Sequence, residues 1–433
     1  MTRRMALSTA EQCCDGNAQA FRDPCGISEI NPPPSVRTRI LIVDDEVTLL
    51  RLMKLGMRSM AGEWDLHFAE SGEEALALIN LQPFDVVITD MRMPGMNGAQ
   101  LLNLVLRDHP RTVRIVLSGY ADLNEVTNCV GLTHQFIDKP CSLDDLKSCL
   151  RRVTNVQGHL NHENIRSATA GLKNLPSLPK VYMEIADAVQ SPDCSTELIA
   201  EIAAKDPGLS AKLLQLSNSA FFGFGRKVYS VDEAVQLLGV SIIQSLALTT
   251  PLYSSFDQKK CPSFPLEQIW EHSAQVATLG RKLFRQHMDD PQLAEQAFAA
   301  GILHDLGKLI LADSLGLEYD AVLKESRATN TPLHLIEQQK LNTTHAEVGA
   351  YLLAIWGLPI PLVEAVACHH FPERCGTREI CLSGIIHIAN ALQHTQPGNT
   401  ETIATPPNLD YLKSIHLDEH FELWQQELAD GEF

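Results

Sequence analysis

The chain has 433 residues, 45% hydrophobic and 20% charged, a globular composition with room for about three units of ~150 residues. The formal net charge of −18 disfavours a mainly electrostatic nucleic-acid binder, which would need a basic face. The sequence has no run of 18 apolar residues and no apolar signal core after Arg3 and Arg4, so we expect a cytoplasmic protein without a membrane span or a secretory signal.

The first 37 residues show no sustained periodicity and end in the proline-rich stretch Asn31–Ser35, which predicts a disordered tail over 1–37. From Arg39 onward, short apolar runs alternate with amphipathic stretches. The predicted strands are 40–43, 65–68, 86–89, 113–117 and 134–137, and the predicted helices are 48–60, 73–81, 98–108, 122–132 and 142–155. This alternation predicts an α/β doubly wound domain with a five-stranded parallel sheet over 38–157.

The last of these helices either ends with the domain or continues as a helical connector over 158–171. The second alternative rests on apolar residues that recur at a spacing of three to four up to Leu160. From 172 to 393 we see no strand pattern and expect an all-α domain. Its predicted helices are 177–190, 196–204, 208–219, 231–250, 266–286, 292–312, 317–329, 345–356, 360–369 and 380–393. Residues 394–433 form a C-terminal extension with an acidic amphipathic stretch near 417–428.

Polar residues stand at the carboxyl ends of the predicted strands, where open parallel sheets bind ligands. These residues are Asp44, Asp45, Asp90, Ser118 and Lys139. Clustered carboxylates suit Mg²⁺, and a carboxylate such as Asp90 can form an acyl phosphate. A lysine ammonium and a bound Mg²⁺ would neutralise the oxygens of the transferred phosphoryl group. The pattern therefore predicts a phosphoryl-transfer site at Asp90, with the Ser118 hydroxyl as a donor to the attached group.

This segment resembles the response-regulator receiver family in Asp44–Glu46, Thr89–Gly98, Ser118-Gly119 and Asp138–Pro140. The resemblance implies that Asp90 accepts a phosphoryl group from a sensor histidine kinase or a phosphotransfer protein. It also implies Mg²⁺ bound by Asp45, Asp90 and the backbone carbonyl of Arg92, with Asp44 acting through a metal-bound water. Phe136 matches the aromatic position that responds to phosphorylation, and Lys139-Pro140 matches the family's cis peptide.

The all-α region resembles the HDOD domain, a signalling module related to the HD-type metal phosphohydrolases. The matching segments are Asn174–Pro179, Asp206–Ser210, Ser217–Gly223 and Ala234–Gly239, and the HD kinship rests on Ala300–Lys308. The kinship implies a candidate metal site for Mn, Fe, Zn or Ni, made of His272, His304, Asp305, His345, His369 and His370.

Asn390 stands where the HD enzymes have a last aspartate ligand, and no Gly-Tyr-Pro triplet follows His370. A neutral Asn is a poorer metal ligand and cannot balance a second cation, so this departure disfavours hydrolysis. Lys308 and Glu347 flank the candidate site and are expected on a solvated helix face.

The cysteines number eleven and include no Cys-x-x-Cys pair, as expected for reduced cytosolic thiols. Cys368, Cys375 and Cys381 lie near two histidines, but their spacings match no zinc module, so we expect no zinc there.

We therefore expect a two-component response regulator whose HDOD domain relays the signal by binding a protein or a nucleotide, and not an enzyme. The alternative is a receiver-regulated, metal-dependent HD-type phosphohydrolase or phosphodiesterase. A transcription factor is disfavoured, because no basic recognition helix or zinc-finger spacing follows residue 157. A homodimer is compatible with the sequence, which does not identify the output partner.

Overall fold

The computed structural model describes residues 37–119, 132–155, 176–218, 226–287, 290–375, 379–394 and 405–430. The predicted tail over 1–37, the predicted helix over 122–132 and the predicted connector over 158–171 lie outside the described residues, apart from Arg37 and Leu132.

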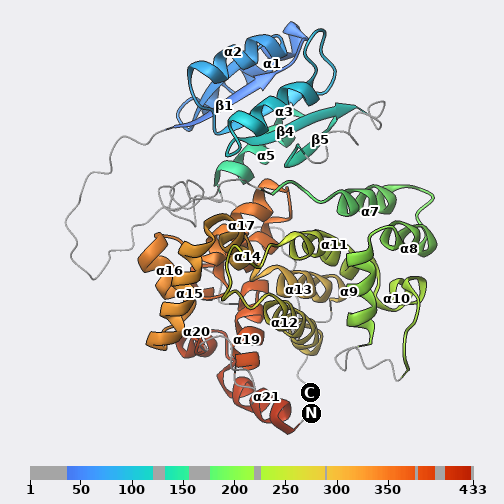
Figure 1. The fold of residues 1–433 in the computed structure, drawn as a ribbon, viewed down its shortest axis with the longest axis vertical. Helices are drawn as coiled ribbons and strands as arrows, with labels where there is room; N and C mark the ends of the chain where they lie inside the picture. The colour runs from blue at the N-terminus through green and yellow to red at the C-terminus, as the bar shows by residue number, and fades with distance from the viewer. Residues whose placement is uncertain are drawn as a thin grey trace, which may run out of the picture. The chain divides into compact units, whose positions relative to one another are not determined.

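The predicted parallel sheet is confirmed, and its five strands are ordered β2-β1-β3-β4-β5. The strands are β1 Thr38–Val43, β2 Trp64–Ala69, β3 Val86–Asp90, β4 Val113–Gly119 and β5 Gln135–Lys139. The described helices around it are α1 Val47–Gly56, a 3-10 turn Arg58–Met60, α2 Gly72–Leu81, α3 Gly98–Asp108 and α5 Leu143–Asn155 (Figure 1). The strand order reverses between β1 and β3, which places a ligand crevice at the carboxyl ends of these two strands.

Alternate residues of each strand face opposite sides of the sheet, so the sheet is buried on both faces. Ile40 and Ile42 of β1 belong to one apolar core with residues of α1 and α5. Leu41 and Val43 belong to a second core with residues of α2 and α3. The apolar runs of β1 and β3 therefore reflect strands without a solvent-exposed face, whereas the edge strand β2 is only partly buried along most of its length.

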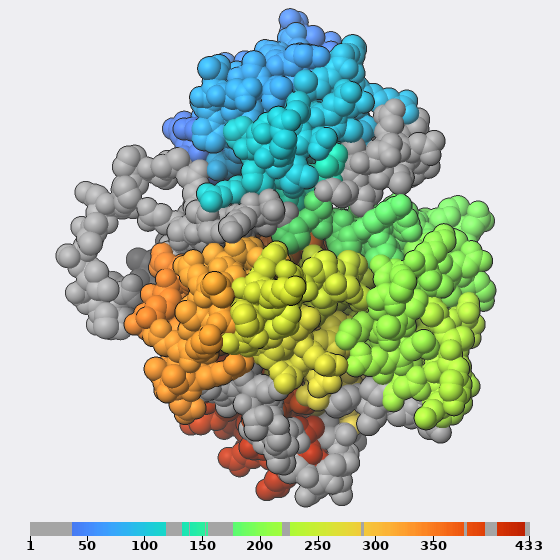
Figure 2. Space-filling view, viewed as in Figure 1, coloured from blue at the N-terminus to red at the C-terminus, as the bar shows by residue number. Residues whose placement is uncertain are grey.

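The C-terminal part is helical throughout its described residues, as predicted. Its helices are α7 Lys180–Gln190, α8 Thr196–Ala204, α9 Pro207–Ser217, α10 Val231–Leu238, α11 Val240–Ser255, α12 Leu266–His287, α13 Pro291–Leu303, α14 Leu306–Leu315, α15 Leu317–Thr329, α16 Leu333–Leu341, α17 His345–Ile355, α18 Ile360–Cys368, α19 Leu382–His394, α20 Leu409–Ser414 and α21 Asp418–Asp430, with a 3-10 turn Pro372–Cys375. Within this part, α7 to α10 lie on one side and α15 and α16 on the other, with α12 and α13 between them (Figures 1 and 2).

Two of the predicted helices are each divided in the structure. The predicted helix 231–250 breaks at Gly239, whose φ of 83° lies in a region that favours glycine. The predicted helix 292–312 breaks at His304 and Asp305, so that this pair lies at the junction of α13 and α14. Among the described residues, no single helix is long and apolar enough to cross a bilayer. Only α10 and α11, bent by 117° at their junction, meet that criterion as a pair.

A glycine brings α14 and α17 into backbone contact. A Cβ atom added at Gly307 would collide with the backbone carbonyl of His345, the first residue of α17. Another close approach occurs at Gly301, where a Cβ atom would collide with the backbone of Ala277 in α12. These contacts hold His304 and Asp305, at the junction of α13 and α14, close to α12 and α17.

We expect Gly307→Ala to destabilise the helical part by about 1–3 kcal/mol, because α14 and α17 would have to separate to admit the methyl group. Gly280→Ala is the matched control, since a Cβ there comes closest to the flexible tip of Ile386, at 3.2 Å, and meets its other neighbours at ordinary contact distances. In the middle of α12 that alanine is expected to be neutral or stabilising by up to about 1 kcal/mol. Urea unfolding followed by circular dichroism measures both variants, and equal stabilities would contradict the close contact.

Candidate phosphorylation and metal sites

The first candidate site lies at the carboxyl edge of the sheet. The Lys139 ammonium at the end of β5 lies 2.8 Å from Asp90 Oδ1 and 2.9 Å from Asp44 Oδ2. Asp90 is the last residue of β3, and Asp44 follows β1. Three strands that are distant in the sequence therefore bring two carboxylates and one ammonium within hydrogen-bonding distance at the edge of the sheet.

The carboxylates of Asp44, Asp45 and Asp90 converge closely enough to share a cation, with their nearest oxygens within 4.8 Å of one another. Asp44 is buried and Asp45 is exposed, so the group opens to solvent on one side. Hard oxygen donors with an open side suit Mg²⁺, which keeps several waters. Arg92 lies in the exposed segment that follows β3, and the peptide Lys139-Pro140 is cis, as predicted.

Three carboxylates and one ammonium meet at this edge, where neighbouring charges shift the pKa values of Asp90 and Lys139. Burial raises the pKa of Asp90, the hydrogen bond and charge of Lys139 partly oppose this, and the Asp44 carboxylate adds to the rise. Burial lowers the pKa of Lys139, but its hydrogen bonds to Asp90 and Asp44 outweigh burial and keep the ammonium charged. The backbone of Ser118 lies on β4, while its side chain is outside the described part. Phe136 on β5 is half-buried and packs against the second core.

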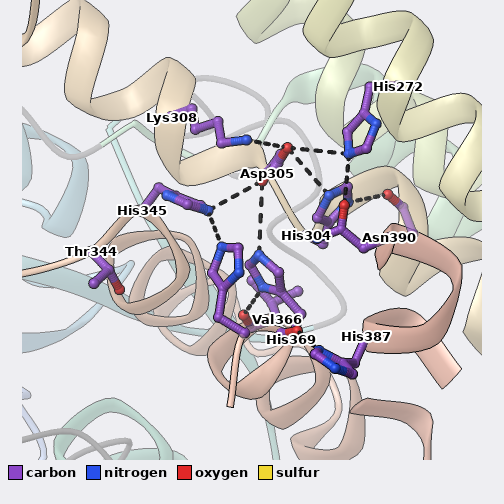
Figure 3. Close-up of polar contacts among 12 residues, drawn as sticks. His272, His304, Asp305, Lys308, Thr344, His345, Val366, His369, His387 and Asn390 are labelled. Carbon is purple, nitrogen blue, oxygen red and sulfur yellow. Dashed lines mark hydrogen bonds and ion pairs between the residues drawn. The ribbon is translucent and has the colours of Figure 1, made fainter. Parts of the chain in front are cut away.

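The second candidate site is a buried cluster of imidazoles around Asp305 (Figure 3). His272 comes from α12, and His304 and Asp305 from the junction of α13 and α14. His345 begins α17, and His369 and His370 follow α18. The structure thus brings together the whole set of ligands that the sequence predicts, from five helices.

The Asp305 carboxylate lies between two pairs of histidines. Its Oδ2 atom lies 3.2 Å from His304 Nε2 and 3.8 Å from His272 Nε2. Its Oδ1 atom lies 3.3 Å from His345 Nε2 and 3.9 Å from His369 Nε2. Ligand atoms of His272, His304 and Asp305 form one metal-sized group, and those of His345, His369 and His370 form another.

The Nδ1 atoms of three of these histidines are held by oxygens. His304 Nδ1 lies 2.7 Å from the carbonyl of Gly301, and His369 Nδ1 lies 2.7 Å from the carbonyl of Val366. A carbonyl oxygen can only accept a hydrogen bond, so these Nδ1 atoms carry a proton, and Nε2 is the ring atom of each histidine that is turned toward the cluster. His345 Nδ1 lies 2.6 Å from Glu337 Oε2.

Several polar atoms of the cluster are buried without a hydrogen bond among the described residues, including His304 Nε2, His369 Nε2 and Asp305 Oδ1. Leaving such atoms unpaired costs stability, so they indicate that a group is missing from the cluster. Imidazole lone pairs and a carboxylate oxygen are donors that a first-row transition metal accepts. The residues present therefore fit a metal ion.

Sequence reasoning missed the residues that support this cluster. Glu337 of α16 is fully buried and accepts hydrogen bonds from the backbone N–H of His345, at 2.9 Å, and from the Tyr319 hydroxyl, at 2.5 Å. His334 stacks on His370 with ring centroids 4.0 Å apart, and His394 stacks on His272 at 5.0 Å. The only available signal was an acidic residue in the short helix before His345, a helix that the sequence analysis also overlooked.

The prediction that Lys308 and Glu347 lie on a solvated helix face is wrong. Lys308 is 5% exposed, and its ammonium lies 2.6 Å from Asp305 Oδ2. Glu347 is also buried, and its carboxylate accepts hydrogen bonds from the Thr343 hydroxyl and the Thr344 backbone N–H at the start of α17. Both were misplaced because α14 and α17 are buried on nearly all sides, so helical periodicity does not mark an outer face.

Asn390 of α19 lies in the cluster at the position where the sequence departs from the HD pattern. Its Oδ1 atom lies 2.9 Å from His272 Nε2, so His272 donates to a neutral amide. Burial lowers the pKa values of His272, His369 and His370 well below the ordinary range, so these imidazoles are neutral. Burial would raise the pKa of Asp305, but His304 and Lys308 hold it well below its usual value.

Comparisons with known proteins agree with both halves of the chain. The response regulator receiver domain matches residues 40–151, and the HDOD domain matches residues 175–372. The chain is 27% identical over 203 residues to an uncharacterized protein of Treponema pallidum, which covers 46% of this chain and 38% of the relative. It is 30% identical over 178 residues to the hydrogenase transcriptional regulatory protein HoxA of Cupriavidus necator, covering 38% of this chain and 36% of HoxA.

A solved HDOD domain protein from Geobacter sulfurreducens is 20% identical, with a TM-score of 0.49, and covers 66% of this chain and 95% of that chain. The chain spans less than two fifths of the length of the two curated relatives.

Proposed function

We propose that this chain, a response regulator that joins a receiver domain to an HDOD domain, accepts a phosphoryl group on Asp90 and relays the signal through its HDOD domain. The donor would be a sensor histidine kinase or a phosphotransfer protein. The observation that supports this most directly is the Lys139 ammonium held between Asp44 and Asp90 at the carboxyl edge of the sheet. A charge in this place can neutralise a phosphoryl group on Asp90.

The proposed chemistry uses the residues as the structure arranges them. Asp44, Asp45 and Asp90 would hold Mg²⁺, with the Arg92 carbonyl as a further ligand, and the ion would supply charge neutralisation. A phosphoryl group adds about −1.5 to −2 charges beside Lys139. Ser118 and Phe136, on neighbouring strands, are the proposed responders. To shift the equilibrium between two conformations of the chain tenfold, phosphorylation has to favour one conformation by only about 1.4 kcal/mol.

Incubation with a small-molecule phosphodonor and Mg²⁺ is expected to add one base-labile phosphate per chain, and Asp90→Asn is expected to add none. Asp108→Asn at the end of α3 is the control, because this exposed aspartate pairs with the neighbouring Arg107 and lies outside the strand ends. Intact-mass analysis counts the phosphates. Equal phosphorylation of wild type and Asp90→Asn would remove Asp90 from its proposed role.

For the HDOD domain we propose a single divalent cation, of Mn, Fe, Zn or Ni, held by Asp305 with His304, His345 and His369. In the cluster the buried acidic charges are Asp305 and Glu337, and Lys308 already contributes one positive charge. With one divalent ion these charges sum to +1, and a second ion would raise the sum to +3 in a buried site, where Asn390 cannot balance it. This balance favours a binding module over a hydrolase that needs paired metals.

Glu337→Gln is expected to weaken metal binding by about 10- to 100-fold, because the carboxylate orients His345 and raises its basicity. Tyr319→Phe is the matched control, since it removes one hydrogen bond to the same carboxylate and keeps its charge. Calorimetric titration with Zn²⁺ or Mn²⁺ on chelator-stripped protein measures both affinities. Identical affinities for Glu337→Gln and wild type would contradict the proposed role of Glu337.

The second candidate function is an HD-type phosphohydrolase, favoured by the carboxylate that faces two pairs of histidines. Such a site could activate water against a phosphoester. Turnover of cyclic dinucleotides or nucleotides by Mn²⁺- or Fe²⁺-loaded protein, abolished in Asp305→Ala, would establish it. Stoichiometric metal without turnover would support the relay function.

A further inference from the structure

Cysteine side chains lie together where α18, the 3-10 turn and α19 meet. Cys368 is the last residue of α18, Cys375 ends the turn, and Cys381 directly precedes α19. All three are free thiols. We propose that Cys368 and Cys375 form a peroxide-reactive dithiol site, in which Cys375 is the attacking sulfur and Cys368 is the sulfur that completes a disulfide. This goes beyond the proposed relay function and does not depend on it.

Hydrogen bonds converge on the sulfur of Cys375. The Ser383 hydroxyl donates to Cys375 Sγ at 3.0 Å. The same hydroxyl oxygen lies 3.2 Å from Cys381 Sγ, so the Cys381 thiol can donate to Ser383 in turn. The Cys368 thiol is also hydrogen-bonded to Cys375. Cys375 therefore accepts from two sides, an arrangement that stabilises a thiolate at this sulfur.

The two sulfurs differ in access as the proposed roles require. Cys368 is 4% exposed, whereas Cys375 is half-buried and can be reached by a small oxidant. The hydrogen bond from Cys368, aided by Ser383 and opposed by burial, lowers the pKa of Cys375 to about 7. About half of such thiols are ionised at neutral pH, compared with a few per cent for an ordinary thiol with a pKa of about 8.5.

The reaction balances with a hydroperoxide as the oxidant. The Cys375 thiolate attacks the terminal peroxide oxygen, the O–O bond breaks, and the leaving alkoxide or hydroxide takes a proton from water. Cys375 is then a sulfenic acid. The Cys368 sulfur attacks Cys375 Sγ, the S–O bond breaks, and the departing hydroxide takes the Cys368 proton as water. Two thiols lose two electrons in total, and the peroxide gains them.

The resulting bond would close a ring over residues 369–374. This segment includes His369 and His370 of the imidazole cluster, and the carbonyl of His369 accepts a hydrogen bond from His387 Nδ1 at 2.8 Å. A zinc site is the competing use of three cysteines. Among the described residues, however, these three sulfurs are absent from the groups that converge to metal-ligand distances, and the Ser383 hydroxyl bridges Cys375 and Cys381.

The test is a hydrogen peroxide time course on the reduced full chain at pH 7, followed by alkylation and peptide mass mapping. We expect Cys375 to react several-fold faster than Cys194, an exposed thiol of the same chain, because hydrogen bonds from Ser383 and Cys368 stabilise the Cys375 thiolate. The expected product is a Cys368–Cys375 disulfide. In Cys368→Ser, Cys375 is expected to stop at a sulfenic acid that a dimedone-type probe captures, and in Cys375→Ser, Cys368 is expected to stay reduced.

Two outcomes would overturn the proposal. One is oxidation of Cys375 no faster than that of Cys194, and the other is a disulfide from Cys375 to Cys381 in place of Cys368. Cys381→Ser is the fold control: it retains the dithiol and is expected to form the same disulfide at a rate within about twofold of wild type, because Cys381 reaches Cys375 only through Ser383.

Discussion

Lowering the pH from 7 to 5 in metal-free buffer is expected to unfold the HDOD domain. Burial lowers the pKa of a whole set of its histidines, namely His272, His334, His369, His370, His387 and His394. The unfolded chain takes up these protons below pH ~6.5, whereas the folded domain resists protonation until a much lower pH. The stability is therefore present above pH 6.5 and is lost as the pH falls.

The size of the effect follows from the protons that unfolding takes up. The pKa values of His334 and His394 fall to about 4 in the folded domain. Each of these histidines therefore lowers the free energy of unfolding by roughly 1.4 kcal/mol for every pH unit below 6.5. Several such histidines together approach the 5–15 kcal/mol by which a domain is typically stable. His345 acts in the opposite direction. Burial lowers its pKa, but Glu337 and Asp305 outweigh burial and raise it, so its contribution is greatest below pH ~6.5 and is lost as the pH rises.

Urea unfolding at a series of pH values measures this dependence. His334→Gln is expected to reduce the proton uptake at pH 5 by about one, because it removes a neutral buried imidazole. His420→Gln on the exposed face of α21 is the control for the substitution itself. A stability that stays flat between pH 7 and pH 5 would show that these imidazoles are protonated in the folded domain.

Asp305→Asn is expected to destabilise the HDOD domain by about 3–5 kcal/mol, because it leaves the Lys308 ammonium buried without its counter-charge. Lys308→Met in the same chain is expected to restore much of that loss, since it removes the stranded charge and keeps the volume. Double-mutant analysis of urea unfolding gives the coupling between the two positions.

Asp313→Asn is the matched control for this cycle. Asp313 also pairs with a lysine at 2.6 Å, but both side chains are 47% exposed, so its loss is expected to cost only 0–1 kcal/mol. Equal costs for Asp305→Asn and Asp313→Asn would show that burial does not set the strength of the Lys308 pair. Additive losses in the double variant would contradict the stranded-charge explanation.

The receiver half was predictable because its signals are local. Each strand is a short apolar run, and Asp44, Asp90 and Lys139 stand directly at strand ends, which a parallel sheet must bring to one edge. The ligands of the HDOD cluster were also found, but only through the family motif around His304 and Asp305. No periodicity links His272 to His369, because their convergence depends on how the helices pack.

The supporting residues could not be found in the same way. Glu337 belongs to a short helix with a weak amphipathic pattern, and its role depends on the tertiary approach of α16 to α17. Lys308 was misplaced for a related reason. A lysine is normally solvated, and only the buried Asp305 carboxylate makes its burial favourable. The burial of charged partners, even of partners only three residues apart such as Asp305 and Lys308, therefore marks the limit of what this sequence alone reveals.

The glycine contacts have a mechanical consequence. With backbone atoms of α14 and α17 touching at Gly307, and those of α12 and α13 touching at Gly301, neither pair can slide past the other without overlap of main-chain atoms. Packed helices often transmit signals by sliding along one another, and we expect the backbone contacts to prevent this motion in these two pairs. Because His304 and Asp305 join α13 to α14, we expect the two pairs to move together and to keep the spacing of the imidazoles that they carry.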